Sequence, residues 1–321
     1  MLLAAQEEYG GCIPFERFMR EALYHPAFGY YSARIREVGR GGDFSTWPTL
    51  DRMPARAIAA WLGGSRPRHI IEVGAGGGKM ADDVLRALGW LGRLRATYHI
   101  VEVSAPLRAV QQKRLGRRAV WHADMVAALR AAGGRAWIIS NELPDAFPCR
   151  VFVRESGTWR ELAVRIEGGK VREILIPCVQ HPRSSAFLHE FPEGSRIEVL
   201  ESYQQWLGSW AGEWKEGGML TIDYGGEMPE LYCRRPAGTV RAYARQQRLT
   251  GADVYGAFGQ RDITCDVNFT DLRDWGESLG WTTRSLASLG GFIASQLPGT
   301  ALPEGFQDAA AAFQVLIQTR A

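Results

Sequence analysis

Residues 72–78, EVGAGGG, carry the strongest chemical signal of the sequence. Gly74, Gly76 and Gly78 follow a short apolar run and precede a helical pattern, and glycine lets a backbone turn tightly against a ligand. A dinucleotide fingerprint would need glycine at position 79, where Lys79 stands. The observed spacing, with the acidic Glu72 before it, instead suits S-adenosylmethionine, which has no pyrophosphate group. A purely structural turn is the alternative interpretation.

Glu102 is the candidate for binding the ribose of such a cofactor. A ribose needs a carboxylate at the end of the second strand, and no acidic residue lies between Asp83 and Glu102. Ser104, two residues further on, is also included among the predicted cofactor-binding residues. The alternative for Glu102 is a solvated carboxylate at a strand end.

Two further groups of acidic residues follow predicted strands. Asp124 stands where adenine amino groups are commonly bound, and a helix N-cap is an equally good interpretation. Further on, Asn141, Glu142 and Asp145 lie in a segment that prolines stiffen. Clustered carboxylates bind a guanidinium or act as a base, whereas the alternative for this cluster is a turn with capping groups.

Strand and helix patterns alternate around these residues. Together they predict a parallel twisted sheet, in which ligands bind at the carboxyl ends of the strands. The predicted strands are 69–73, 97–103, 119–122, 136–140, 219–224 and 313–319, and the predicted helices are 55–62, 79–88, 106–115, 125–132, 200–215 and 271–279.

Other parts of the chain lack this alternation. Residues 15–23 predict an amphipathic helix, and 29–48 a long ordered loop. Residues 151–177 alternate in polarity around glycines, which is typical of antiparallel hairpins. Residues 238–267 are interpreted as a glycine-punctuated loop.

The composition and the net charge exclude several classes of protein. The 321 residues are 46% hydrophobic and carry a formal net charge of +3, which is typical of a globular protein and gives no bulk attraction for nucleic acid. No apolar stretch is long enough to span a bilayer, and the first residues do not resemble a secretory signal, so we expect a cytoplasmic, bacterial protein. Five scattered cysteines argue against a disulfide framework or a metal site.

Several segments, in this order, resemble the MidA family of S-adenosylmethionine-dependent methyltransferases, which includes the mitochondrial complex I assembly protein arginine methyltransferase. The resemblance covers about residues 15–272. The sequence departs from the family pattern at Thr49, at Leu143 and at Pro144. All three positions are on the side of the site that is expected to bind the methyl acceptor. The segments are FMREALYHPAFGYYS, GRGGDFST, EVGAGGG, VEVSAPLRAVQQKRL, SNELPDAFP, LTIDYG, GTVRAY and DITCDVNFTDL.

The resemblance implies an α/β fold with a Rossmann-like class I methyltransferase core, an N-terminal helical cap and a β-rich insertion. It also implies that Asp43 and Phe44 close over S-adenosylmethionine and that Asn141 lies at both the cofactor and the methyl-transfer site. The expected segments are 1–54 for the cap and the cofactor-covering loop, 55–147 for the first part of the core, 148–198 for the insertion that binds substrate, and 199–321 for the return to the core.

The implied reaction is methylation of an arginine side chain of a protein, with a respiratory-complex subunit as one candidate substrate. Glu142, Asp145 and Asn141 are then the predicted catalytic residues, and no metal is needed. Asp223 and Tyr224, at the end of the strand 219–224, are expected to form the opposite wall. The alternatives are a small-molecule methyltransferase and a non-catalytic assembly factor that binds the same cofactor.

Overall fold

The computed structural model describes residues 6–35, 51–244 and 247–321. The chain forms two compact units, each built from segments that are distant in the sequence. Unit 1 comprises Met1–Arg34, Pro144–Gln205 and Gly226–Asp271, and unit 2 comprises Ile35–Leu143, Trp206–Gly225 and Leu272–Ala321.

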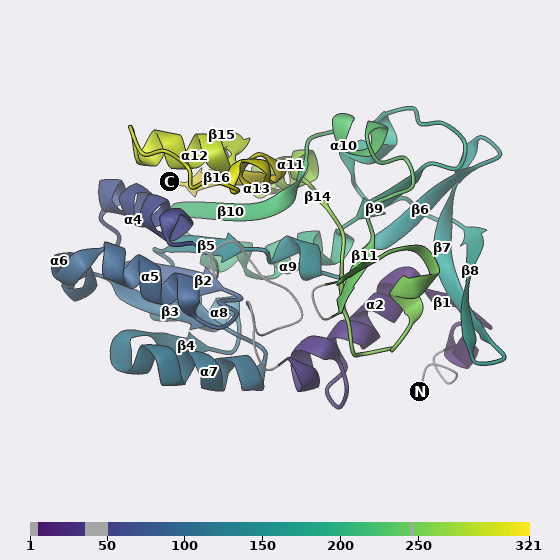
Figure 1. The fold of residues 1–321 in the computed structure, drawn as a ribbon, viewed down its shortest axis with the longest axis horizontal. Helices are drawn as coiled ribbons and strands as arrows, with labels where there is room; N and C mark the ends of the chain where they lie inside the picture. Colours follow the sequence, from purple (N-terminus) through teal and green to yellow (C-terminus); the bar gives the residue numbers. More distant parts are fainter. Residues whose placement is uncertain (1–5, 36–50, 245–246) are drawn as a thin grey trace. The chain divides into compact units, whose positions relative to one another are not determined.

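A twisted sheet forms the centre of unit 2, with its strands in the order β15-β16-β10-β5-β2-β3-β4 (Figure 1). The strands from β10 to β4 are parallel, whereas β16 is antiparallel to both of its neighbours. The predicted parallel series is therefore confirmed. The strands are β2 (His69–Val73), β3 (Thr97–Val101), β4 (Val120–His122), β5 (Trp137–Asn141), β10 (Gly217–Gly226), β15 (Thr282–Ser288) and β16 (Phe313–Arg320).

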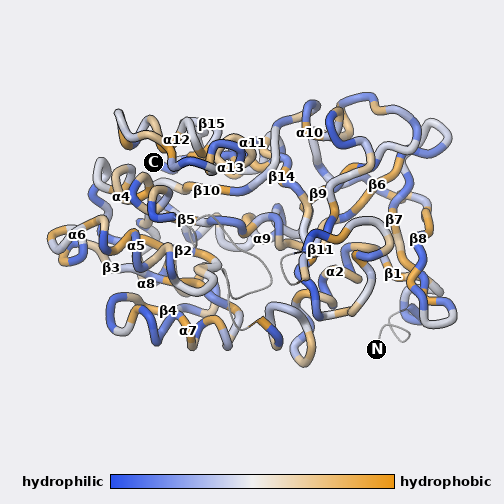
Figure 2. The backbone as a smooth tube through the Cα atoms, viewed as in Figure 1, coloured by the Kyte–Doolittle hydropathy of each residue, from blue (hydrophilic) through white to orange (hydrophobic). Residues whose placement is uncertain are grey.

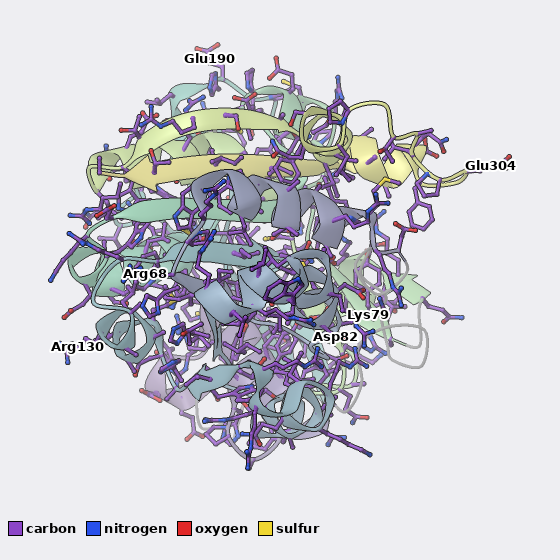
Figure 3. All side chains as sticks on the ribbon, turned by 90° about the vertical axis from the view of Figure 1, so that its left-hand side faces the viewer. Arg68, Lys79, Asp82, Arg130, Glu190 and Glu304 are labelled. Carbon is purple, nitrogen blue, oxygen red and sulfur yellow. The ribbon has the colours of Figure 1, made fainter. Side chains whose placement is uncertain are left out.

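Most helices of unit 2 bury an apolar face against this sheet, whereas α6 (Gly89–Arg95) has no buried residue. Ile58, Val84 and Phe292, from three helices, belong to one core cluster with Ile100 of β3. Figure 2 shows hydrophobic residues recurring along these elements, whereas charged side chains such as Arg130 extend outwards (Figure 3). The helices are α4 (Met53–Ser65), α5 (Lys79–Ala87), α6 (Gly89–Arg95), α7 (Ala105–Leu115), α8 (Met125–Ala131), α12 (Leu289–Gln296) and α13 (Gln307–Ala312).

The predicted helix 200–215 is shorter in the structure. Helix α9 (Glu201–Trp210) is followed by a single 3₁₀ turn, η5 (Ala211–Glu213). The indole N–H of the buried Trp214 donates a hydrogen bond of 3.0 Å to the carbonyl oxygen of Ala136. This tertiary contact directs the chain into β10 and ends the helix before the predicted position.

An antiparallel sheet is the main feature of unit 1. Its order is β1-β7-β6-β9, with β8 paired to residues 160–167 of β7, and the predicted hairpins are confirmed. Gly157, Gly168 and Gly169 have φ values of 73°, 56° and 76° at the hairpin turns. The strands are β1 (Ile13–Pro14), β6 (Arg150–Glu155), β7 (Thr158–Glu167), β8 (Lys170–Pro177) and β9 (Arg196–Val199).

The predicted N-terminal helix is confirmed as α2 (Phe15–Tyr24), whose apolar face is buried. The interpretation of 238–267 as a loop was wrong, because short strands form there by pairing with one another. They are β11 (Arg241–Ala244), β12 (Gln247–Leu249) and β13 (Asp262–Thr264). The predicted loop 29–48 begins with a π-helix, η1 (Tyr30–Arg34), and residues 36–48 lie outside the described residues.

The described chain has further short elements besides the 3₁₀ turns η2 (Gly116–Arg118) and η4 (Ser185–Leu188). They are α10 (Glu230–Cys233), the 3₁₀ turn η6 (Gly251–Tyr255), β14 (Val267–Asn268) and α11 (Phe269–Ser278). Among the described residues, no helix combines the length and the apolar character that a bilayer crossing requires.

Candidate active site

The register of the parallel strands brings most of the predicted cofactor residues to one edge of the sheet in unit 2. Val73, the last residue of β2, pairs with Val101 of β3 and with Ser140 of β5. Val101 in turn pairs with His122, the last residue of β4. The residues that follow these strands therefore share the carboxyl edge. The strand order reverses between β2 and β5, and ligands bind at such a switch point.

The glycine turn follows β2 at this switch point. Gly74, Gly76 and Gly78 have φ values of 67°, 52° and 71°, which L-residues with a Cβ rarely adopt. A Cβ at Gly74 would lie 3.1 Å from Cδ1 of Leu143. The turn therefore keeps its backbone exposed to a ligand only because these positions are glycines.

Glu102 follows β3, and its side chain is buried. Its Oε1 accepts a hydrogen bond of 2.8 Å from the backbone N–H of Ser104, and its Oε2 accepts one of 2.8 Å from Nε2 of Gln111. Burial raises the pKa of Glu102, although these hydrogen bonds lower it. A hydrogen bond from the Val103 backbone also lowers this pKa, and the remaining acceptor capacity of the carboxylate suffices for a ribose hydroxyl group.

Gln111 of α7 is a residue that the sequence interpretation missed. Its Nε2 also donates 2.9 Å to the carbonyl oxygen of Gly76, and its Oε1 accepts 3.0 Å from Nε1 of Trp121. One buried amide thus connects the glycine turn with the Glu102 carboxylate. The sequence contained a signal for it, because Gln111 is polar but lies between Leu107 and Leu115 on the buried face of the helix.

Glu72 lies on β2, before the glycine turn, and is almost completely buried. Its Oε2 accepts a hydrogen bond from the hydroxyl group of Tyr98 on β3. Burial raises the pKa of Glu72 to about 7, because a buried carboxylate loses its hydration. The carboxyl group is therefore partly protonated near neutral pH.

This pKa predicts a specific pH dependence of stability. The folded protein binds a proton at Glu72 more tightly than the unfolded chain, whose carboxyl group titrates near pH 4.5. The contribution of Glu72 to the free energy of unfolding is thus complete below pH 4.5 and decreases by about 3 kcal/mol as the pH rises through 7. Urea unfolding at several pH values should show this decrease in the wild type relative to Glu72→Gln.

The quantity to measure is the difference in the free energy of unfolding between the wild type and Glu72→Gln. His99 changes this free energy with pH in the opposite direction. Burial, together with the neighbouring His122 and His69 imidazoles, lowers the pKa of His99 to about 4. The contribution of His99 to the free energy of unfolding decreases as the pH falls from 6.5 to 4, equally in the wild type and the variant. A difference that stays constant from pH 4.5 to 7 would contradict the assignment of the raised pKa to Glu72.

Ser104 and Asp124 both cap helices in the structure. The Ser104 hydroxyl accepts a hydrogen bond of 3.4 Å from the N–H of Leu107, at the start of α7. Asp124 Oδ1 accepts 2.8 Å from the N–H of Ala127, at the start of α8. The capping interpretation of Asp124 is therefore confirmed, while adenine binding by Asp124 and cofactor binding by Ser104 stay predictions.

Asn141 ends β5, and Glu142 follows it at the same carboxyl edge. The Asn141 amide donates a hydrogen bond of 3.1 Å to Oε1 of Glu142, and the Glu142 N–H donates 2.9 Å to the carbonyl oxygen of Ile222. Glu142 has a φ of 50°, a left-handed conformation that costs free energy in a residue with a side chain. Such strain is concentrated at functional sites.

Asp145 belongs to unit 1, in the 3₁₀ turn η3 (Pro144–Ala146). Its buried carboxylate accepts a hydrogen bond of 2.7 Å from Oγ1 of Thr264 on β13. A second buried carboxylate on β13, that of Asp262, accepts 2.7 Å from the hydroxyl group of Tyr31. The motif DITC therefore supplies contacts around η3 that the sequence interpretation did not foresee.

The remaining predicted positions are Asp43, Phe44, Thr49 and Asp223. Asp43, Phe44 and Thr49 lie outside the described residues. Asp223 of β10 is fully buried, and its Oδ1 accepts a hydrogen bond of 2.8 Å from the N–H of Tyr224. The role of Asp223 as a wall of the site stays a prediction.

A family model of S-adenosyl-L-methionine-dependent methyltransferases matches residues 54–287, which is most of the chain and includes the glycine turn, Glu102 and Glu142. The chain belongs to this family. This methyltransferase is therefore an enzyme whose cofactor is S-adenosylmethionine, and the predicted fold class is confirmed.

Solved structures and curated relatives agree with this assignment. A Burkholderia thailandensis protein crystallised with S-adenosyl-homocysteine is 28% identical, with a TM-score of 0.86 over 99% of this chain and 90% of that one. The mitochondrial protein arginine methyltransferases NDUFAF7 of Xenopus tropicalis and Homo sapiens are 28% and 26% identical over 82% of this chain. This methyltransferase spans 67% and 65% of their lengths.

The residues at the carboxyl edge of the methyltransferase sheet fit its cofactor. S-adenosylmethionine carries a ribose, whose hydroxyl groups require hydrogen-bond acceptors, and no phosphate. The Glu102 carboxylate offers such acceptors, and at Gly74 a Cβ would press against Leu143. Binding of the cofactor by these particular residues stays a prediction. Among the described residues, no group of three histidine, cysteine or acidic residues is arranged to hold a metal ion.

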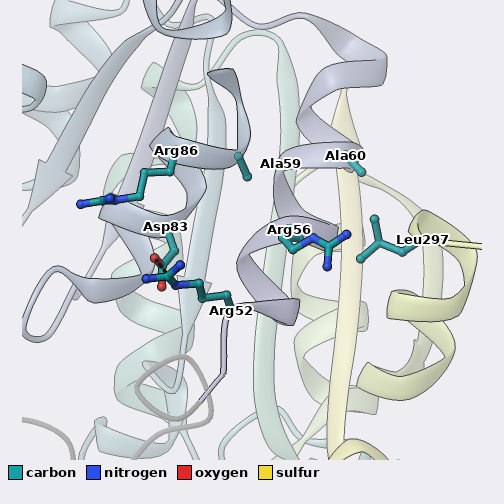
Figure 4. Close-up of a pocket in the computed structure, with 8 residues that line it drawn as sticks. Arg52, Arg56, Ala59, Ala60, Asp83, Arg86 and Leu297 are labelled. Carbon is teal, nitrogen blue, oxygen red and sulfur yellow. Dashed lines mark ion pairs between the residues drawn. The ribbon is translucent and has the colours of Figure 1, made fainter. Parts of the chain in front are cut away.

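A cavity of about 470 Å³ in unit 2 of the methyltransferase contains none of the predicted site residues (Figure 4). It lies between α4, α5 and the residue that follows α12. Its one carboxylate, Asp83, is paired with Arg52 at 3.3 Å and with Lys79. Arg86 is paired with Asp82 at 3.0 Å. These internal ion pairs account for Arg52, Asp83 and Arg86, Arg56 is the remaining charged residue of the lining, and we assign no ligand to this cavity.

Proposed function

We propose that this methyltransferase transfers a methyl group to an arginine side chain of a protein substrate. The observation that carries the proposal is the strained Glu142, whose carboxylate accepts a hydrogen bond from Asn141 at the cofactor edge of the sheet. The names of the NDUFAF7 relatives, which are protein arginine methyltransferases, support this choice of acceptor.

An arginine acceptor presents a chemical problem that carboxylates solve. The guanidinium group is always protonated, and its lone pairs are delocalised, so each nitrogen is a poor nucleophile. Bound S-adenosylmethionine supplies an electrophilic methyl group on a positively charged sulfur. Glu142 accepts paired, charge-assisted hydrogen bonds from the planar guanidinium and orients one nitrogen towards that methyl group.

The proposed methyl transfer is balanced in bonds, charge and protons. The attacking nitrogen forms a bond to the methyl carbon while the carbon–sulfur bond breaks, which leaves S-adenosylhomocysteine. The nitrogen becomes more acidic as it is alkylated and releases one proton to a nearby carboxylate or to water. Asp145, three residues after Glu142, is the second carboxylate in this proposal, with Thr264 Oγ1 fixing its orientation.

The proposal also includes a cellular setting. The substrate is a folded or nascent protein that presents an arginine, a respiratory-complex subunit being the first candidate, and the compartment is the bacterial cytoplasm. The net charge of +3 supports a protein rather than a nucleic acid as the substrate, since it offers little bulk attraction for polyanions.

Incubation with a radiolabelled methyl donor and a bacterial lysate tests the proposal. Acid hydrolysis of the labelled proteins should release methylarginine, and excess unlabelled S-adenosylhomocysteine should suppress the label. Label found only in small molecules would replace the protein acceptor with a small-molecule acceptor. Binding of S-adenosylhomocysteine with no transfer in any lysate would instead identify a non-catalytic assembly factor.

A further inference from the structure

Unit 1 contains a cavity of about 770 Å³ that no predicted function uses. One wall is a face of the antiparallel sheet, where Val151, Leu162 and Val171 form an apolar floor. The opposite wall comes from residues 237–240 and 248–255, the second of which includes part of β12 and all of η6. A volume of this size accommodates a small ligand or several side chains of a peptide.

The carboxylates inside this cavity are already satisfied by the protein itself. Glu198 is buried, and its two oxygens accept hydrogen bonds of 2.9 and 2.8 Å from the backbone N–H and the hydroxyl group of Thr239. Glu173 accepts bonds of 3.0 and 2.5 Å from the Arg196 guanidinium and one of 2.6 Å from the Tyr255 hydroxyl group. Glu173 is thus paired with Arg196, whereas both hydrogen-bond partners of Glu198 are neutral, so Glu198 keeps its negative charge at the cavity.

Of the described residues, three arginines and two glutamates line the cavity, a formal excess of one positive charge, and Arg172 and Arg248 are the two arginines outside the pair of Arg196 with Glu173. Arg172 has a side chain that is 69% exposed and pairs with Glu167 at 3.8 Å, which is a weak surface contact. Arg248 is exposed and forms no ion pair among residues 6–35, 51–244 and 247–321. The cavity is thus complementary to an anionic group.

The edge of β8 also borders the cavity. In the described part of the chain, β8 pairs only with β7. Val171, Arg172 and Glu173 are consecutive, so their side chains alternate between the two faces of the sheet, yet all three line the cavity. The cavity therefore reaches the edge of the strand, and such an edge can pair with an extended peptide.

We propose that this cavity binds an extended, acidic segment of the protein substrate, in which apolar residues alternate with aspartate or glutamate. The apolar side chains lie on the floor formed by Val151, Leu162 and Val171. The carboxylates pair with Arg172 and Arg248. This inference rests on the proposed function in one respect, namely that the substrate is a protein.

Peptide binding tests this inference directly on the full-length protein. A dye-labelled octapeptide that alternates leucine and glutamate should bind at least tenfold more tightly than its leucine–lysine counterpart, as measured by fluorescence anisotropy. Its binding should weaken at higher salt and should slow hydrogen exchange in β8.

The double variant Arg172→Glu/Arg248→Glu should bind the leucine–glutamate peptide at least tenfold more weakly. The double variant Arg93→Glu/Arg95→Glu, on the exposed surface of α6, is the matched control and should bind as the wild type does.

Three results would overturn the inference. They are equal binding of both peptides, a similar loss of affinity in the α6 control, or displacement of the peptide by an oligouridylate that protects the same strand, which would identify a nucleic-acid site. The outcome is independent of the reaction itself. A peptide that binds while arginine methylation is absent refutes the proposed function alone, and methylation without peptide binding refutes the docking site alone.

Discussion

Replacement of Glu142 by glutamine is expected to lower turnover about a hundredfold and to leave the affinity for S-adenosylhomocysteine within about twofold of the wild type. The amide keeps the size of the side chain but removes the charge that orients the acceptor guanidinium. The loss of one pre-aligned charged partner commonly costs about 3 kcal/mol at a transition state. Steady-state kinetics and calorimetry on the same preparations separate the two effects.

Two further variants separate the chemistry of Glu142 from its backbone strain. Glu142→Gly relieves the left-handed φ of 50° and should stabilise the fold or leave its stability unchanged, yet it should be as inactive as Glu142→Gln. Glu216→Gln is the matched control, since Glu216 is an exposed carboxylate that pairs with Arg135 at 3.1 Å. Wild-type turnover in Glu142→Gln would reduce Glu142 to a turn residue.

Asp145→Asn is the companion variant in unit 1. Thr264 Oγ1 still finds an oxygen acceptor in the asparagine side chain, so the fold should persist. Turnover should decrease about a hundredfold if Asp145 binds the guanidinium or accepts its proton. Turnover at the wild-type level would leave Asp145 with the structural role that its hydrogen bond to Thr264 already gives it.

Loss of the Glu102 carboxylate is expected to weaken cofactor binding more than any other single change at the site. Glu102→Ala removes the acceptors for the ribose hydroxyl groups, and each hydrogen bond to a charged group contributes about 1.5 to 3 kcal/mol. The affinity for S-adenosylhomocysteine should therefore decrease about tenfold to a hundredfold. The KM for S-adenosylmethionine should increase, whereas kcat at saturating cofactor should change little.

Gln111→Leu tests whether the buried amide positions Glu102. The variant removes the donor to Glu102 and to the carbonyl oxygen of Gly76, so the affinity for S-adenosylhomocysteine should decrease about tenfold. Gln112→Leu on the exposed face of the same helix is the matched control. Gln111→Glu should not rescue binding, because its carboxylate would repel that of Glu102. Unchanged affinity in Gln111→Leu would show that the ribose carboxylate needs no such support.

The core of the fold was predictable because its signals are local. Each strand of the parallel series is a short apolar run, each crossover helix has its own periodic pattern, and the glycine turn requires φ values that only glycine adopts easily. Parallel strands with right-handed crossovers bring their carboxyl ends to one edge. For this reason the sequence alone determined that Gly74, Glu102 and Asn141 would lie together.

Contacts between distant segments were decided only by the tertiary structure. Thr264 reaches Asp145 across 119 residues, and Tyr31 reaches Asp262 across 231. The strands β11 to β13 exist because they pair with one another, and no local run of apolar residues predicts such pairing. Gln111 stands out in the sequence only as a polar residue on an apolar helix face, and its partners were decided when α7 packed beside the glycine turn. Local patterns thus determined the element types and the sheet edge, while burial and long-range hydrogen bonds decided which polar side chains support the site.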